Sequence, residues 1–371
     1  MRILMSTDTI GGVWTYSIEL CAQLSARGHE VVLAAMGPPP SAAQEAAAAE
    51  IANVRLHWQQ FKLEWMDEPW ADLQRCGQWL LSLADEMEPD VVHLNHYCNT
   101  RLPWHRPVLV VAHSCVLSWW QAVKGEPAPA RWRRYAAGVA DGLHAADVLV
   151  APTLTMLSQL RRHYGPLPPA RVIYNGLACD RATAAIAEKE LLALSAGRLW
   201  DEAKNAAALA KAAAMLPWPV YLAGATDHPA ATRDGRVEGV RCLGPLDRRE
   251  LLAWMARAAV YVLPARYEPF GLTALEAAMR GCALVLGDIR SLREVWGRSA
   301  IFVPPTDAVA LARAIDRVLS DEPLRLLLAR QARLRAARFT AVRMAQSYLA
   351  LYRRLLEGRL VSVPELEGVS A

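Results

Sequence analysis

The sequence predicts an α/β protein made of two doubly wound layers, each a parallel sheet with helices on both faces. Short apolar runs alternate with helical patterns along the chain, which is typical of strand and helix units that build parallel sheets. At 371 residues the chain is long for a single core. Two domains of ordinary size are therefore expected, with a cleft between them.

The apolar runs are short, rich in β-branched residues and bounded by polar residues, which favours strands. In the first half we expect strands at residues 2–5, 31–35, 91–94, 108–112, 148–151 and 172–174. In the second half we expect strands at residues 191–196, 220–223, 240–243, 260–263, 283–286 and 300–303. Helices are predicted to fill the intervals.

The domain boundary is expected after the last strand of the first half. Asn175 and Gly176 form a turn signal there, and residues 177–189 lack a strand pattern, which indicates a linker. The predicted domains are residues 1–178 and 186–339. Residues 340–358 have the apolar periodicity of a final amphipathic helix.

Composition argues against several classes of function. Lysine and arginine number 41 against 37 acidic residues, and this near balance gives little reason to expect a nucleic acid partner. The seven cysteines form no C-x-x-C pair, so they indicate a reducing compartment and no structural zinc. No apolar stretch has the length of a signal peptide or a membrane span, which predicts a cytoplasmic protein.

Glu268 and Glu276 stand eight residues apart around Gly271. Pro269 biases Glu268 toward an extended conformation, so Glu268 is expected on a loop that follows strand 260–263. A helix that begins just after Gly271 would direct its unbonded N–H groups and its positive dipole end toward this loop. A diphosphate would be stabilised there, and both carboxylates could accept hydrogen bonds from sugar hydroxyls.

A less specific interpretation exists for both carboxylates. The run from Thr273 to Glu276 fits a capping box, in which Glu276 would only satisfy a backbone N–H at the start of a helix. A loop carboxylate such as that of Glu268 is often merely solvated.

Two cations follow the first strand of the second half. Arg198 comes directly after Gly197, and Lys204 follows on the first turn of the next helix, so both could meet one anion. The alternative is that Asp201 and Glu202 pair with these cations on a solvated surface.

The first half offers two further candidates. Gly11 and Gly12 form a turn between the first strand and the next helix; the turn lacks the G-x-G-x-x-G spacing but lets backbone N–H groups approach a ligand. His113 follows strand 108–112, at the sheet edge where α/β folds bind ligands. A tight turn without a ligand and a plain structural histidine are the alternatives.

The nonapeptide from Glu268 to Glu276, with Gly197-Arg198 and Lys204 before it, resembles the E-x7-E signature of retaining glycosyltransferases of the GT-B fold, specifically family four. The resemblance extends over nearly the whole chain and is strongest over residues 195–304. It implies two Rossmann-like domains that face each other across a cleft. It also implies an acceptor-binding amino-terminal domain, a nucleotide-sugar-binding carboxyl-terminal domain, and a last helix that crosses back onto the amino-terminal domain.

The resemblance also implies roles for individual residues. The catalytic set would be Arg198, Lys204, Glu268 and His113. The donor would be bound by Gly12, Arg198, Lys204, Arg241, Glu268, Phe270, Gly271, Leu272, Thr273 and Glu276. Arg198 and Lys204 would grip the diphosphate, Glu268 and His113 the transferred sugar, Glu276 the ribose and Arg241 the base.

No Asp-x-Asp motif is present, so fixed cations and a helix terminus are expected to replace a metal ion, and no cofactor is expected. Family four is generally interpreted as using front-face attack, in which the departing phosphate oxygen takes the acceptor proton. Glu268 would then not act as a nucleophile.

Nine of the thirteen tryptophans precede the predicted linker, and Trp14, Trp119 and Trp120 are the candidate acceptor contacts. Residues 119–124 and 131–134 mix aromatic and basic residues as membrane-surface segments do, so a lipid-linked acceptor and a peripheral membrane contact are possible; a solvated helix face is the alternative.

The sequence thus predicts a metal-independent, retaining hexosyltransferase that uses a nucleoside diphosphate sugar and a hydroxyl acceptor. The alternatives are a GT-B sugar-nucleotide epimerase and a catalytically silent partner subunit. The silent subunit is disfavoured by the intact set of Arg198, Lys204, Glu268 and Glu276.

Overall fold

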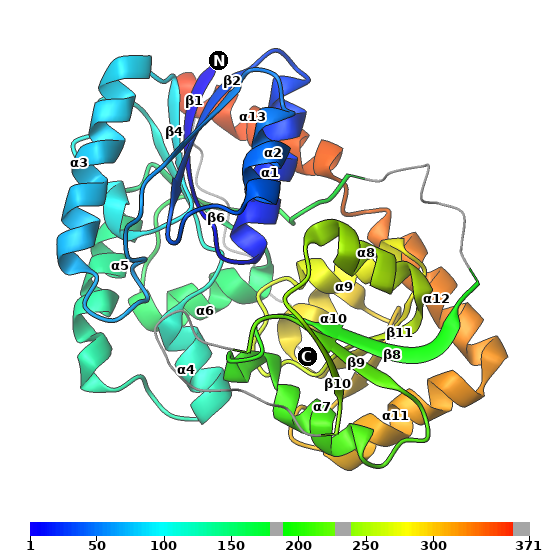
Figure 1. Cartoon of the computed structure of the whole chain (residues 1–371). Coiled ribbons are helices and arrows are strands. Elements are labelled where there is room, and N and C mark those ends of the chain that lie inside the picture. Colours follow the sequence, from blue (N-terminus) through cyan, green and yellow to red (C-terminus); the bar gives the residue numbers. More distant parts are fainter. Residues whose placement is uncertain (179–187, 227–238, 359–371) are drawn as a thin grey trace. The chain divides into compact units, whose positions relative to one another are not determined.

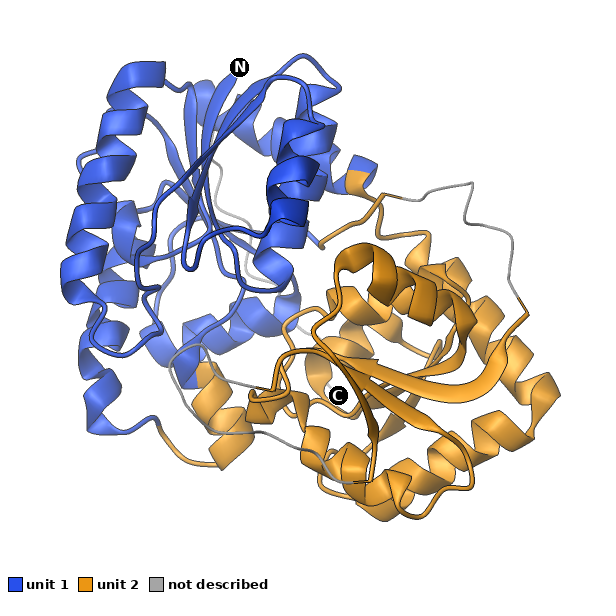
Figure 2. Cartoon of the chain, viewed as in Figure 1, with its two compact units in different colours: residues 1–117, 128–174, 342–371 blue, residues 118–127, 175–341 orange. Residues whose placement is uncertain are grey.

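The computed structural model describes residues 1–178, 188–226 and 239–358. The chain divides into two compact units (Figure 2). Unit 1 holds Met1–Leu117, Ala128–Tyr174 and the residues from Val342 onward, and unit 2 holds Ser118–Pro127 and Asn175–Ala341. Most of the expected linker, together with the first two residues of the expected second domain, lies outside the described residues.

Unit 1 is built on a parallel sheet with the order β3-β2-β1-β4-β5-β6-β7 (Figure 1). The strands are β1 (Arg2–Asp8), β2 (Glu30–Met36), β3 (Val54–Trp58), β4 (Val91–Leu94), β5 (Val108–Val111), β6 (Val148–Ala151) and β7 (Ala170–Val172). All four residues of β4, β5 and β6 are buried, because helices cover both faces of a parallel sheet. These three strands therefore appear in the sequence as apolar runs, interrupted only by His93 in β4.

Helices connect most of the strands of the first half. They are α1 (Gly12–Ser25), α2 (Ala42–Ala49), α3 (Trp70–Met87), α4 (Val116–Lys124), α5 (Arg133–Ala145) and α6 (Leu154–Tyr164), with short 3-10 turns η1 (Cys98–Arg101) and η2 (Ala130–Trp132). Ser41 and Gln44 form a capping box at α2, and Thr153 caps α6. Helix α4 begins in unit 1, but its residues from Ser118 onward belong to unit 2.

The last helix, α13 (Ala341–Leu356), packs into unit 1 through buried aromatic residues. The Tyr352 hydroxyl lies 2.6 Å from Nδ1 of His93, and the Tyr16 hydroxyl lies 3.2 Å from Nε2 of the same ring. Tyr348 packs 5.1 Å from the His93 ring. The expected return of the last helix to the amino-terminal half is confirmed, and His93 serves as its buried polar anchor.

Unit 2 repeats the doubly wound plan in a six-stranded parallel sheet with the order β10-β9-β8-β11-β12-β13. The strands are β8 (Glu190–Ala196), β9 (Val220–Ala223), β10 (Arg241–Gly244), β11 (Ala258–Leu263), β12 (Ala283–Gly287) and β13 (Ile301–Val303). The other elements are the 3-10 turn η4 (Glu202–Lys204) and the helices α7 (Ala206–Ala213), α8 (Arg248–Arg257), α9 (Leu272–Met279), α10 (Arg290–Trp296), α11 (Ala308–Ser320) and α12 (Glu322–Ala336). Trp296 and Tyr261 are its largest fully buried side chains.

Both sheets share the doubly wound plan, in which the strand order reverses beside the first strand of each unit, and the predicted α/β class is confirmed. Strand β3 was not predicted because Val54–Trp58 is a half-exposed edge strand with no continuous apolar run. Strand β7 ends at Val172, where the prediction began. In the described part of the chain, no helix combines the length and apolarity needed to cross a membrane.

Candidate functional site

The candidate site of unit 2 lies at the carboxyl ends of β8 and β11. These strands pair in the middle of the sheet, and the strand order runs in opposite directions on either side of them. Ligands of doubly wound proteins bind at this reversal point, outside the carboxyl ends of the strands. Gly197 and Arg198 follow β8, and the loop that carries Glu268 follows β11.

Lys204 and Glu268 come together at this edge although 64 residues separate them in sequence. Lys204 Nζ forms an ion pair with Glu268 Oε2, and the Gly271 N–H donates to Glu268 Oε1 at 3.0 Å. Both side chains are largely buried, with 20% and 12% exposed. Each oxygen of Glu268 therefore has a donor within unit 2.

Helix α9 points its amino terminus at the same place. Its N-cap is Gly271, in the left-handed region at φ 89°, and no side chain caps the helix. The capping-box interpretation of Thr273 and Glu276 is therefore wrong, since the helix begins before Thr273. The Glu268 carboxylate, which accepts the Gly271 N–H, therefore stands at the positive end of the α9 dipole.

Glu276 lies in the second turn of α9 and is buried, with 7% exposed. Its Oε1 accepts a hydrogen bond from Arg248 Nε, at the start of α8, at 3.2 Å. Sequence analysis missed this partner, because no local pattern links positions 28 residues apart.

The Arg198 guanidinium pairs with one carboxylate, that of Asp201, and remains partly exposed. Its guanidinium NH2 lies 3.0 Å from Asp201 Oδ2, its Cζ lies 5.3 Å from the Trp200 ring, and its side chain remains 39% exposed. The pairing of Arg198 with Asp201 that the sequence left open is present. Lys204, by contrast, pairs with Glu268, and Glu202 pairs with Lys124.

Asp201 is a buried anion among cations. Burial favours a raised pKa, but the charges of Arg198 and Lys204 and the hydrogen bonds from Trp119 and the Ala203 N–H outweigh it and hold the pKa of Asp201 below its usual range. Asp201 is consequently ionised at neutral pH.

Asn205 connects the two loops of the site and was not predicted. It takes the left-handed conformation at φ 61°, and its amide Nδ2 donates to the carbonyls of Pro264 at 2.8 Å and Pro305 at 2.7 Å. It thereby ties the loop of Lys204 to the end of β11, from which the Glu268 loop begins. The only local signal in the sequence is an asparagine, a residue type that tolerates the left-handed conformation, directly after Lys204.

Several predicted donor contacts have other positions. Phe270 is buried, with 3% exposed, and packs edge-on against Phe339 at 5.7 Å, so its side chain belongs to the core of unit 2. Leu272 packs against the same core. Arg241 is exposed, and its NH1 donates to the Tyr221 hydroxyl at 2.9 Å.

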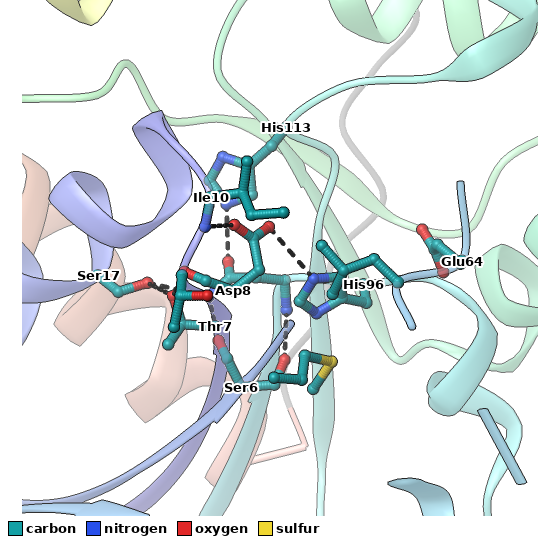
Figure 3. Close-up of polar contacts among 12 residues, drawn as sticks. Ser6, Thr7, Asp8, Ile10, Ser17, Glu64, His96 and His113 are labelled. Carbon is teal, nitrogen blue, oxygen red and sulfur yellow. Dashed lines mark hydrogen bonds and ion pairs between the residues drawn. The ribbon is translucent and has the colours of Figure 1, made fainter. Parts of the chain in front are cut away.

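In unit 1, His113 stands at the carboxyl end of β5, close to the strand-order reversal between β1 and β4 (Figure 3). Asn95 Nδ2 donates to the Ser6 carbonyl at 2.6 Å, so Asn95 Oδ1 is left as the acceptor for His113 Nε2 at 2.7 Å. Burial, with the charges of His93 and His96, lowers the pKa of His113 to about 3. The neutral ring therefore carries its proton on Nε2, and Nδ1 can accept a hydrogen bond.

A buried carboxylate and histidine lie beside His113 and were not predicted as a pair. Asp8 ends β1, and its Oδ2 lies 3.4 Å from His96 Nε2, while its Oδ1 accepts the Ile10 N–H at 2.8 Å (Figure 3). Glu64 accepts the N–H groups of Tyr97 and Cys98 at 3.0 and 2.9 Å. The sequence feature that could have indicated Asp8 and His96 is that polar residues follow apolar strands there.

The candidate acceptor contacts differ in position. Trp14 is buried, with 7% exposed, in the core of unit 1. Trp119 donates from Nε1 to Asp201 Oδ1 at 2.9 Å, so it contacts the loop of unit 2 that carries Arg198 and Lys204. The Trp120 ring is tilted against that of Trp119, with centroids 5.6 Å apart, and is partly exposed, whereas Gly12 at the start of α1 is exposed.

Two family descriptions match consecutive parts of the chain. Glycosyltransferase Family 4 matches residues 10–181, and Glycosyl transferases group 1 matches residues 190–321. The chain belongs to the family four glycosyltransferases. The resemblance inferred from the E-x7-E and Gly-Arg…Lys motifs is thus confirmed, as is the prediction of a hexosyltransferase.

Curated relatives of this glycosyltransferase include a glycogen synthase of Mycobacterium tuberculosis, 41% identical over 124 residues, which are 32% of this chain and 30% of that protein. A D-inositol 3-phosphate glycosyltransferase of Xylanimonas cellulosilytica is 28% identical over 395 residues, covering 95% of this chain and 94% of that protein. This chain therefore spans less than a third of the first relative and nearly all of the second.

Solved structures share the fold of this glycosyltransferase. Sucrose-phosphate synthase of Thermosynechococcus elongatus matches with a TM-score of 0.76 at 22% identity, over 96% of this chain and 100% of that chain. The Anabaena protein HepE in complex with UDP-glucose matches with a TM-score of 0.74 at 17% identity, over 95% of this chain and 99% of that chain. The GT-B fold is thereby confirmed.

Proposed function

We propose that this glycosyltransferase transfers a hexose from a nucleoside diphosphate sugar to a hydroxyl acceptor, without a metal ion and with retention of anomeric configuration. The observation that carries the proposal is the convergence of Arg198, Lys204, Glu268 and the amino terminus of α9 at the reversal point of the unit 2 sheet. Two cations and a helix dipole at one edge suit a diphosphate.

The ion pairs that Arg198 and Lys204 form support the proposal that both bind the diphosphate. Lys204 is compensated by Glu268, and Arg198 by one oxygen of Asp201. An entering diphosphate would provide the oxygens that Lys204 and the exposed face of Arg198 require. Glu268 would then be free to accept hydrogen bonds from the sugar hydroxyls.

These fixed positive charges would stabilise the leaving diphosphate, which is why we propose catalysis without a metal. In the reaction the bond between the anomeric carbon and the diphosphate oxygen breaks, and a bond to the acceptor oxygen forms on the same face. The acceptor proton passes to the departing phosphate oxygen. This same-face step requires no enzyme nucleophile, so we assign Glu268 to orienting the sugar.

We assign the transferred sugar to the Nδ1 of His113, which can accept a hydrogen bond from a hydroxyl group. The acceptor is proposed to bind unit 1. Relatives are named as D-inositol 3-phosphate glycosyltransferases and a glycogen synthase, and HepE was solved with UDP-glucose. Nucleoside diphosphate hexoses are therefore the donors to test first.

The proposal is tested by measuring thermal stability and diphosphate release with a panel of nucleoside diphosphate hexoses in the presence of EDTA. We expect one donor to raise the melting temperature and to be turned over slowly by transfer to water. Lys204→Ala should lower this turnover by about 10²-fold, as for loss of one electrostatic contact to the developing charge. Lys211→Ala, an exposed lysine on α7, is the matched control and should behave as wild type.

Two results would contradict the proposal. Wild-type protein that responds to no donor would remove the transferase assignment and favour a silent partner subunit. Activity that EDTA abolishes and Mg²⁺ restores would contradict the metal-independent mechanism while leaving the donor class in place.

A further inference from the structure

The part of α4 that belongs to unit 2 packs against the loop that carries Arg198 and Lys204. Three consecutive residues, Asp201, Glu202 and Ala203, each meet the segment Ser118–Pro127. Trp119 donates to Asp201 Oδ1 at 2.9 Å, and Lys124 Nζ lies 2.7 Å from both carboxylate oxygens of Glu202.

The contact also has an apolar part. Val123, Ala203 and Tyr267 form a small buried cluster, and Trp119 packs against it. The Ala203 carbonyl accepts the Arg266 N–H at 2.9 Å, which joins this loop to the loop of Glu268. Trp119 therefore lies against the backbone that positions both Arg198 and Lys204.

The two oxygens of Asp201 have different partners. Oδ1 accepts from Trp119 Nε1 at 2.9 Å and from the Ala203 N–H at 3.0 Å, whereas Oδ2 alone accepts from Arg198 at 3.0 Å. Because Oδ1 is occupied, the guanidinium is paired through a single nitrogen. A carboxylate oxygen can accept two hydrogen bonds, and Trp119 and the Ala203 N–H use both positions of Oδ1. Without the Trp119 bond one position would be open, and the planar guanidinium could bind both oxygens in the bidentate geometry that arginine and carboxylate prefer.

We infer that Trp119 is a positioning residue for the donor diphosphate, acting through Asp201 to hold Arg198 in a one-oxygen pair that leaves its remaining N–H groups for the ligand. This inference rests on the proposed function of the unit 2 site. It assigns Trp119 to donor binding, in place of the acceptor contact expected from the sequence.

Trp119→Phe tests the inference, because it removes the Nε1 donor and keeps an aromatic ring in the apolar cluster. We expect the donor KM and the inhibition constant of the free nucleoside diphosphate to rise about three- to tenfold, the effect of one hydrogen bond. Inhibition by the corresponding nucleoside should not change, because Arg198 acts on the diphosphate.

The chain offers a matched control in Trp218→Phe. Trp218 Nε1 also donates to an aspartate, Asp316 Oδ1, at 2.9 Å, in a contact between the approach to β9 and helix α11. This variant should lose comparable thermal stability without any change in the nucleoside diphosphate constants. Asp201→Ala supplies the coupling test, because Trp119→Phe should add nothing further to it.

The outcomes are distinguishable. If wild-type protein binds a nucleoside diphosphate and Trp119→Phe binds it equally well, or if the effects of Trp119→Phe and Asp201→Ala multiply, the inference is overturned and the proposed function stands. If wild-type protein binds no nucleoside diphosphate or its sugar, both fall together.

Discussion

Two histidines of unit 1, the fully buried His93 and the partly buried His113, make its stability depend on pH. Burial lowers the pKa of His93 to about 3, and burial with neighbouring positive charge lowers that of His113 to about 3. In the unfolded chain both would titrate near about 6.5. The unfolded state therefore binds more protons between these values, and stability is present above about pH 6.5 and lost progressively as the pH falls toward 3.

We expect the free energy of unfolding to fall between pH 6.5 and 5, where carboxylates contribute little, by up to about 1.4 kcal/mol per pH unit for each histidine. Denaturant titrations at several pH values measure it. His93→Gln, which removes one titrating group, should show a shallower slope than wild type. An equal slope in the two proteins would refute the assignment of His93.

The sequence predicted which charged residues gather at the site better than it predicted which side chains are buried. Arg198, Lys204 and Glu268 were found because motif and strand order place them at one edge of the sheet. The burial of Trp14 and Phe270 was not predicted, because an aromatic side chain beside a motif can turn into the core and composition does not report that direction.

At the scale of elements, the donor site depends on close packing between two strand ends. A Cβ on Gly224, which follows β9 at φ 139°, would lie 1.8 Å from the carbonyl oxygen of Gly197. That carbonyl immediately precedes Arg198. Only glycine allows β9 to approach β8 this closely.

Gly224→Ala should therefore displace the Gly197-Arg198 backbone and weaken nucleoside diphosphate binding as well as stability. Gly165→Ala is the matched control, since Gly165 also has positive φ, at 74°, but a Cβ there meets nothing within 4 Å. Each variant carries the conformational cost of about 1 kcal/mol, and only Gly224→Ala adds the clash. Equal losses of stability in the two, measured by denaturant unfolding, would contradict this account.

Elements were predictable where they are buried on both faces. The bounds of β4, β6 and β9 agree with the sequence prediction, because each is a short, mostly apolar and mostly buried run that is not at the edge of its sheet. The edge strand β3 was missed, since its residues are half exposed. The Trp119–Asp201 contact spans 82 residues and leaves no local pattern to read.

At the scale of the whole molecule, two units with separate cores should respond separately to mutation. Helix α13 is anchored in unit 1 by the Tyr352 hydroxyl, 2.6 Å from His93 Nδ1, whereas the donor site belongs to unit 2. Tyr352→Phe leaves a buried ring nitrogen without this partner, which costs about 1–3 kcal/mol.

We expect Tyr352→Phe to lower the melting temperature while the inhibition constant of the nucleoside diphosphate remains that of wild type. Calorimetric unfolding and inhibition by the nucleoside diphosphate together test the separation. If nucleotide affinity fell together with the melting temperature, the site of unit 2 would depend on the packing of α13 in unit 1.

The central claim is that a diphosphate replaces the internal partners of Arg198 and Lys204, and a crystal structure with the bound nucleoside diphosphate sugar tests it most directly. We expect diphosphate oxygens within hydrogen-bonding distance of Arg198, Lys204 and the first N–H groups of α9, the Lys204–Glu268 pair opened, and Trp119 still bonded to Asp201. A diphosphate bound away from these residues, or held by a metal ion, would contradict the account.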